Sequence, residues 1–361
     1  MNKNEDLNME LLNVITTLSH EFGAQQFVKA GGGNSSVKTK ETLWIKPSGV
    51  SLANIKINDF VKVDRNALQQ LHNMTPPQNP TLREQEVTKL LKASVIEGSG
   101  RPSVETPLHD AFDQSFVVHT HPPIINGLLC SNQSKGYSNK LFPNALWMPY
   151  TDPGFTLSSK TREQMEDWKK AHGAHPSILF IQNHGVFVAA NTADDVRSIY
   201  KHIFTTLRAV YNEAGIMIND TECQTTQMDA KLCGLGNVLK KHEFGIAIPR
   251  PAHIAAAPIT PDHVVYLKAF PLISNSTEIK IDDINRYEQK FGYSPKVIIT
   301  PAHLIAVGES EVNAKMILDI ALDAAEVTRY AQAFGGICEL NEESWQFIEH
   351  WEAENYRRKQ I

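Results

Sequence analysis

The sequence is poor in cysteine, and its four cysteines are widely spaced along 361 residues. None belongs to a Cys-x-x-Cys pair, so the spacing excludes a disulfide framework and a zinc site built from thiolates. We expect all four to be packing residues in the core: Cys130, Cys223, Cys233 and Cys338.

Strong charge and long apolar runs are also missing. The formal net charge is -5 and no long block of Lys and Arg occurs, which argues against nucleic acid or an anionic membrane as the main partner. No apolar stretch approaches the roughly 18 residues of a membrane span, and the polar start of the chain has no hydrophobic signal-peptide core. With 42% hydrophobic residues, the sequence predicts a globular, cytoplasmic protein that binds a small molecule.

Glycine is concentrated in one short stretch, "KAGGGNSSVK", at 29–38. Three glycines let the backbone come close to a ligand, and the short side chains of Asn34, Ser35 and Ser36 offer hydrogen-bond donors, which suits an anion such as phosphate. The loop lacks the Gly-Lys-Ser/Thr end of a P-loop, and Ser36 stands where a dinucleotide fingerprint needs its third glycine. An ordinary β-hairpin turn is the alternative.

Helical and strand-like patterns alternate along the chain and predict an α/β fold. Apolar spacing predicts helices over 7–22, 83–97, 192–214, 282–291 and 311–334, with another opened by Ser103 as N-cap. Strand-type residues dominate 26–45, 115–121, 177–190 and 296–308. Prolines and small residues gather near 245–257, so we expect a catalytic domain at 1–248 and a smaller α/β accessory region at 249–361.

Two histidines in "FVVHTHPP" have the spacing of a ligand pair, because a strand sends His119 and His121 to the same face. Such pairs also occur on wet sheet faces without metal, so a third ligand is needed. His184 in "FIQNHGVF" stands before Gly185, which permits a sharp turn, although it could be a hydrogen-bonded turn histidine. Three histidines are the number that catalytic zinc sites use while leaving a position open for substrate, so we expect Zn²⁺ or another divalent metal here.

A carboxylate in "RPSVETPLHDAF" has two explanations. Glu105 is expected in the first turn of a helix, where the macrodipole favours a negative charge and explains the residue without any function. Beside a metal held by imidazoles, the same carboxylate could coordinate the metal and carry protons. His109, four residues later, lies on the same helical face and is a candidate support for Glu105, with plain packing as the more frequent reason for such a histidine.

Taken in order, these motifs resemble the class II aldolase/adducin family. The likeness is specific to the aldolase part of bacterial rhamnulose-1-phosphate aldolase/short-chain dehydrogenase fusions, and "TPDHVVY" and "FIEHWEAE" extend it toward the C-terminus. No glycine-rich Rossmann opening occurs in this sequence, so oxidoreductase activity is not implied. The motifs that carry the resemblance are "GGGNSSVK", "LWIKPSG", "RPSVETPLH", "HTHPP", "MPYTDPGF" and "NHGVF".

The resemblance implies an α/β/α-layered domain with a central, mostly antiparallel sheet, assembled as a homo-tetramer with sites at subunit interfaces. It implies that Glu105 is the acid/base, that Tyr150 protonates the aldehyde, and that the metal ligands are His119, His121 and His184. Many relatives carry a serine where this chain has Val104, so one hydroxyl donor for phosphate is missing. The implied phosphate-binding residues are Gly33, Asn34, Ser36, Ser48, Gly49 and Ser103.

The implied activity is metal-dependent aldol cleavage of a ketose 1-phosphate, of the rhamnulose or fuculose type. The products are dihydroxyacetone phosphate and an aldehyde, formed through an enediolate that the metal stabilises. A sugar-phosphate decarboxylase, epimerase or dehydratase is the alternative on this scaffold. Metal-dependent hydrolysis leaves the glycine loop unexplained, and the intact histidine set disfavours a non-catalytic adducin-like module. Residues 250–361 show no motif with clear chemistry and could shape the pocket or mediate assembly.

Overall fold

A computed structural model describes residues 3–218, 228–229 and 244–351, and its larger part is built on one sheet. Its strands are β1 (Asn34–Lys38), β2 (Thr42–Ile45), β3 (Val61–Asp64), β4 (Val95–Glu97), β5 (Phe116–Thr120), β6 (Leu146–Met148), β7 (Ile178–Ile181) and β8 (Gly185–Ala190). Their order is β4-β3-β2-β1-β5-β8-β7-β6. Only the β6–β7 pair is parallel among these neighbours, which confirms the predicted mostly antiparallel sheet.

Helices cover both faces of this sheet, and the central strands β1, β5 and β8 are buried throughout. Alternate residues of β5 show the two layers: Phe116 and Val118 pack on one side, whereas Val117 packs on the other with Leu108 and Leu157. The first side is covered by α1 (Lys3–Phe22), α5 (Pro123–Leu129) and α8 (Ala193–Glu213), and the second by α4 (Thr106–Asp110) and α7 (Phe155–His172). The helices α2 (Arg65–Asn73), α3 (Pro80–Ala93) and α6 (Ser134–Leu141) complete this part.

A second, smaller sheet lies toward the C-terminus, as predicted. It consists of β9 (Met228–Asp229), β10 (Phe244–Pro249), β11 (Leu272–Ile273), β12 (Val297–Ile299) and β13 (His303–Gly308), in the order β11-β12-β13-β10-β9. One face packs against α10 (Ile281–Phe291) and the other against α11 (Glu311–Ala331). The division at residue 248 stays a prediction, and β10, which ends at Pro249, belongs to the smaller sheet.

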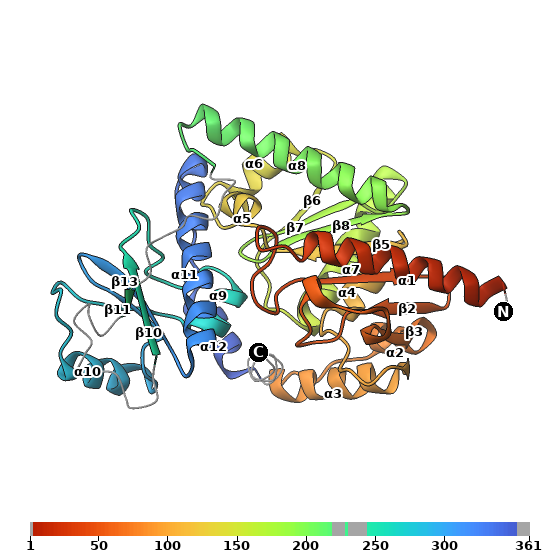
Figure 1. The fold of residues 1–361 in the computed structure, drawn as a ribbon. Coiled ribbons are helices and arrows are strands. Elements are labelled where there is room, and N and C mark those ends of the chain that lie inside the picture. Colours follow the sequence, from red (N-terminus) through yellow and green to blue (C-terminus); the bar gives the residue numbers. More distant parts are fainter. Residues whose placement is uncertain (1–2, 219–227, 230–243, 352–361) are drawn as a thin grey trace.

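The long helix α11 joins the two parts, and Figure 1 shows it running between the two sheets. It packs closely on α5, because a Cβ added to Gly127 would lie 2.2 Å from Cβ of Tyr330. Beside it lie the helices α9 (Pro261–Leu267) and α12 (Glu342–His350), which share a buried cluster with Ile320 of α11. The C-terminal region is therefore docked on the larger part through a glycine-permitted helix contact.

Most predicted helices are confirmed, but one predicted helix end is wrong and the alternative interpretation of the glycine loop does not hold. The helix predicted over 83–97 ends at Ala93, where the Ser94 hydroxyl bonds the Leu91 carbonyl, and the β-branched residues that follow form β4 at the sheet edge. The glycine loop is no hairpin turn, because it precedes β1 and the hairpin lies between β1 and β2. Ala30 and Gly33 take positive φ angles of 47° and 66°, so this stretch cannot be a regular strand.

The cysteine prediction holds in part for the residues that the structure describes. Cys130 is fully buried, Cys338 is half-buried, and Cys223 and Cys233 lie outside the described residues. Among the helices of the described ranges, none has the length and apolar content that crossing a membrane requires.

Candidate metal centre

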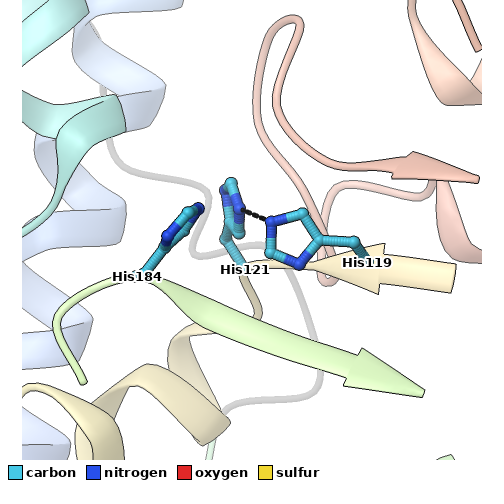
Figure 2. A group of neighbouring side chains, drawn as sticks. All are labelled: His119, His121 and His184. Atoms are coloured by element: carbon cyan, nitrogen blue, oxygen red, sulfur yellow. Dashed lines mark hydrogen bonds between the residues drawn. The ribbon is translucent and has the colours of Figure 1, made fainter. Parts of the chain in front are cut away.

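Three histidines converge where β5 ends and β8 begins (Figure 2). His119 lies in β5, His121 follows it, and His184 directly precedes β8, whose Val186 pairs with Thr120. One ligand atom from each histidine lies within 4.8 Å of the others. Strand pairing thus brings together residues that are far apart in the sequence.

Gly185 is required for this convergence. A Cβ at position 185 would lie 2.5 Å from Cδ2 of His121 and 2.6 Å from the carbonyl oxygen of Thr120. Any other side chain would therefore push β8 away from the histidines.

The hydrogen bonds of two rings fix which nitrogen faces the centre. Nδ1 of His119 lies 2.9 Å from the Val186 carbonyl and Nδ1 of His121 lies 2.6 Å from Oδ2 of Asp262. Both oxygens accept, so both Nδ1 atoms donate, and in the neutral rings both Nε2 atoms present lone pairs, 2.9 Å apart. Facing lone pairs repel, and this donor set fits a shared divalent cation.

Glu105 completes the donor set. Its Oε1 lies 3.6 Å from Nε2 of His119 and 3.3 Å from Nε2 of His184, and it is buried without a hydrogen-bond partner among the described residues. A carboxylate oxygen is costly to bury in this way unless a cation or a proton balances it. The residues present therefore fit a bound divalent metal.

The ionisation states agree with metal binding. Burial lowers the pKa of His119 well below its usual value, which keeps the ring neutral. Burial alone would raise the pKa of the Glu105 carboxyl, but the His119 and His184 rings and the bond from Asn34 hold it well below its usual value. Neutral imidazole and ionised carboxylate are the forms that bind metal.

The turn before α4 places Glu105. Ser103 Oγ accepts the Glu105 N–H at 3.2 Å, and the Ser103 carbonyl accepts the Thr106 N–H at 3.0 Å. This turn delays the start of the helix, so the N-cap is Glu105 itself. The predictions of Ser103 as N-cap and of Glu105 in the first helical turn are therefore wrong.

A chain of hydrogen bonds supports the carboxylate from behind. Asn34 Nδ2 donates to Oε2 of Glu105 at 2.5 Å, so Asn34 Oδ1 must accept from Nε2 of His109, and Nδ1 of His109 accepts from the Ser36 hydroxyl at 2.7 Å. Burial lowers the pKa of His109 to about 3, which leaves it neutral with one proton to donate. His109 is therefore linked to Glu105 by hydrogen bonds through Asn34, and packing alone does not explain it.

A pocket opens beside the histidines and gathers much of the predicted site. Predicted residues that line it are Gly33, Asn34, Ser48, Ser103, Glu105, His121 and His184. Val104, which stands where the family resemblance predicts a serine, also lines the pocket. The lining set does not include Ser36, whose hydroxyl bonds His109, or Gly49. Tyr150 also lies outside it and packs with the cluster of α9 and α12.

Two further lining residues, Lys46 and Asp262, escaped the sequence reasoning. Lys46 ends the strand-like part of "LWIKPSG", is 3% exposed, and donates from Nζ to the Val50 carbonyl at 2.6 Å. The readable signal in the sequence was the lysine beside the serine and glycine of "KPSG", because a lysine charge suits an anion site. Asp262 stands in "TPDHVVY", where the resemblance continued without an assigned role.

Comparison with known proteins gives a family match and one curated relative. The sequence profile of the Class II Aldolase and Adducin N-terminal domain matches residues 13–210. The uncharacterized oxidoreductase YuxG of Bacillus subtilis (strain 168) is 25% identical over 391 aligned residues, which cover 91% of this chain and 55% of that protein. The chain thus spans about half the length of the curated relative that it matches.

Similar solved structures carry related descriptions. The N-terminal class II aldolase domain of a conserved Thermoplasma acidophilum protein is 24% identical, with a TM-score of 0.47 over 55% of this chain and 92% of that one. YgbL of Escherichia coli, a putative aldolase/epimerase/decarboxylase, is 16% identical, with a TM-score of 0.42 over 60% and 96%. The L-fuculose-1-phosphate aldolase of Thermus thermophilus is 15% identical, with a TM-score of 0.37 over 58% and 97%.

Proposed function

The chain belongs to the class II aldolase and adducin family, and on this premise we propose that it is a divalent-metal-dependent aldolase. The proposed substrate is a ketose 1-phosphate of the rhamnulose or fuculose type, cleaved to dihydroxyacetone phosphate and an aldehyde. Glu105 carries the proposal, because one carboxylate oxygen faces the histidines and the other is held by Asn34. That placement puts a proton-transferring group beside the metal donors, at the wall of a pocket.

The residues divide the chemistry among them. His119, His121 and His184 would hold a divalent cation, which would supply Lewis-acid stabilisation of negative charge on the substrate oxygens. In the condensation direction, ionised Glu105 takes a proton from C3 of dihydroxyacetone phosphate, and in cleavage it returns that proton. Asn34 keeps the Glu105 carboxylate pointed at the histidines throughout.

The proton on the aldehyde oxygen needs a second group, and Tyr150 stays the predicted one. Its ring packs against the cluster of α9 and α12 instead of lining the pocket, so this role requires the hydroxyl to approach the substrate on binding. We propose that Tyr150 protonates the aldehyde oxygen in this way. We also propose that the chain assembles as a homo-tetramer with active sites at subunit interfaces.

Three side chains that line the pocket suit the phosphate group. Lys46 brings a positive charge, and Ser48 and Ser103 bring hydroxyls. The Asn34 amide is taken up by Glu105 and His109, so we propose that Asn34 serves the carboxylate more than the phosphate. Phosphate anchored here lends binding energy remote from the breaking bond and orients the substrate.

Coupled detection of dihydroxyacetone phosphate tests the proposal. Rhamnulose, fuculose and xylulose 1-phosphates are offered to the zinc-loaded protein, to His121→Ala and to Glu105→Gln. We expect release from one sugar, with both variants inactive. Release from none of them by protein that binds metal would overturn the aldolase proposal, and decarboxylase, epimerase and dehydratase assays would follow.

A further inference from the structure

Asp262 links the C-terminal region to the three histidines. We propose that Asp262 is a positioning residue of the metal centre, which holds His121 in the orientation and tautomer that a metal needs. The inference rests on the proposed function only in so far as the histidines bind a metal. The matched family domain ends at residue 210, so Asp262 would be a site residue from outside that domain.

The contact is short and sheltered. Oδ2 of Asp262 lies 2.6 Å from Nδ1 of His121, and the two side chains are 13% and 12% exposed. Asp262 also lines the substrate pocket, and so does the neighbouring Pro261. The carboxylate therefore faces the site, not solvent.

The helix that carries Asp262 is held in place on several sides. Thr260 caps α9 by accepting the His263 N–H at 3.3 Å, and Val264 and Val265 are buried in the cluster shared with α11 and α12. The position of the carboxylate is thus set by packing of the whole C-terminal region, which α11 docks on α5.

The glycine loop makes room for this contact. A Cβ added to Gly32 would lie 2.6 Å from Oδ2 of Asp262 and 3.4 Å from Nδ1 of His121. One of the three consecutive glycines is therefore explained by the His121–Asp262 pair, without any phosphate. Three segments that are far apart in the sequence meet at this point.

The physical effect follows from imidazole chemistry. A neutral histidine has two tautomers, and only the one with its proton on Nδ1 offers the Nε2 lone pair toward His119 and His184. A carboxylate on Nδ1 selects that tautomer, orients the ring and makes Nε2 a better donor. Without Asp262, His121 loses these three advantages while keeping its place after β5.

A second pair of the same kind supplies a matched control. His263 Nε2 lies 3.1 Å from Oδ2 of Asp323, and both side chains are buried in the same C-terminal region. This pair joins α9 to α11, whereas the Asp262 pair joins α9 to the metal histidines. Asp323→Asn therefore removes a comparable carboxylate from a cavity that His121 and Asp262 also line, while it leaves the His121–Asp262 contact itself in place.

The experiment compares the full chain with Asp262→Ala, Asp262→Asn and Asp323→Asn. Zinc affinity is measured by competition with a chromophoric chelator, and the His121 tautomer is read from ring ¹⁵N shifts of the metal-free protein. We expect Asp262→Ala to weaken zinc binding by about 10- to 100-fold and to mix the tautomers. Asp262→Asn should lose less, because its amide oxygen still accepts the proton, and Asp323→Asn should match the unaltered chain in both measurements.

Unchanged zinc affinity and an unchanged Nδ1–H tautomer in folded Asp262→Ala would overturn the inference, and so would equal losses in Asp323→Asn. If Asp262→Ala does not fold, two results together would overturn the inference. These are an unchanged zinc affinity in Asp262→Asn and a mixture of His121 tautomers in the unaltered chain. Neither measurement uses a sugar phosphate, so failure of the aldolase assay leaves this test standing. If the unaltered chain binds neither zinc nor another divalent metal, the proposed function fails, while the tautomer measurement still decides the role of Asp262.

Discussion

The two sides of the metal centre are supported in different ways. Glu105 is held by a chain of neutral groups from β1 and α4, which all lie within the matched family domain. His121 is held by a charged group, Asp262, which comes from α9 in the C-terminal region. The difference teaches that the larger part holds Glu105, the proposed proton-transfer group, by its own residues. His121, a proposed metal ligand, is held by a residue of the C-terminal region.

Replacing Glu105 should give the largest loss of activity among these variants. Glu105→Gln keeps the shape and can still meet Asn34, but it removes the charge and the ability to move a proton. Because proton transfer by a placed group contributes about 10²- to 10⁴-fold, we expect kcat to fall by that range. Isotope exchange at C3 of dihydroxyacetone phosphate measures the loss directly. Retained exchange would show that another residue moves the C3 proton.

Removing the support behind Glu105 should have a smaller effect. His109→Leu leaves the buried Asn34 Oδ1 without its donor, so the carboxylate is no longer fixed. We expect kcat to fall by about tenfold and zinc affinity to fall less than in Asp262→Ala, by analogy with other supporting residues of metal sites. Asp262→Ala should show the opposite pattern, with zinc affinity lost first.

The double variant of His109 and Asp262 sharpens this contrast. The two residues touch different groups, so their effects on kcat/KM at saturating zinc should add within about 0.5 kcal/mol. A larger coupling energy would mean that the carboxylate and the imidazole respond as one unit. Ser36→Ala, which removes only the far end of the chain, is the mild control.

Gly32 offers a way to disturb the metal side from the glycine loop. Gly32→Ala places a Cβ against Oδ2 of Asp262, and the carboxylate can move only by leaving His121. We expect a loss of zinc affinity close to that of Asp262→Ala, and no greater than about 100-fold. Gly136→Ala is the control, because a Cβ there meets nothing within 4 Å. A phosphate-only role for Gly32 would instead raise KM and leave zinc binding intact.

Local patterns predicted the parts of the site that local geometry controls. The period of two in a strand put His119 and His121 on one face, and a glycine after His184 marked the tight approach of β8. Helices α1, α8 and α11 followed from apolar spacing over long stretches. Short elements were less readable, because Val95 continues the apolar spacing of Val87 and Leu91 in α3, and only pairing with β3 makes 95–97 a strand.

Long-range contacts could not be read in the same way. Asp262 stands 141 positions from His121, and nothing in its neighbourhood distinguishes it from an acidic residue in the first turn of a helix. The hydrogen bonds of Asn34 depend on Glu105 and His109, which come near only because α4 packs on the sheet that contains β1. Tertiary packing, which no spacing encodes, decided both.

A charge behind His109 is expected to change stability and leave zinc binding unaffected. Lys38 Nζ donates to the His109 carbonyl at 2.7 Å, and burial lowers the pKa of Lys38 to about 7, even though Asp110 opposes the shift. In the unfolded chain the amine keeps its proton up to its ordinary pKa of 10.5. Between these values the unfolded state binds more protons, so this group makes the protein more stable as the pH rises from about 7 to about 10.

Lys38→Met tests this without a large change of volume. The free energy of unfolding is measured by urea titration at several pH values between about 7 and about 10. Its slope against pH should be larger in the unaltered protein than in the variant, by at most about 1.4 kcal/mol per pH unit. The difference between the two proteins isolates Lys38, since the buried Tyr200 and Cys130 titrate in both. Parallel curves would mean that Lys38 keeps its charge in the folded protein. A cation would then lie next to His109, and the groups that support Glu105 would not all be neutral.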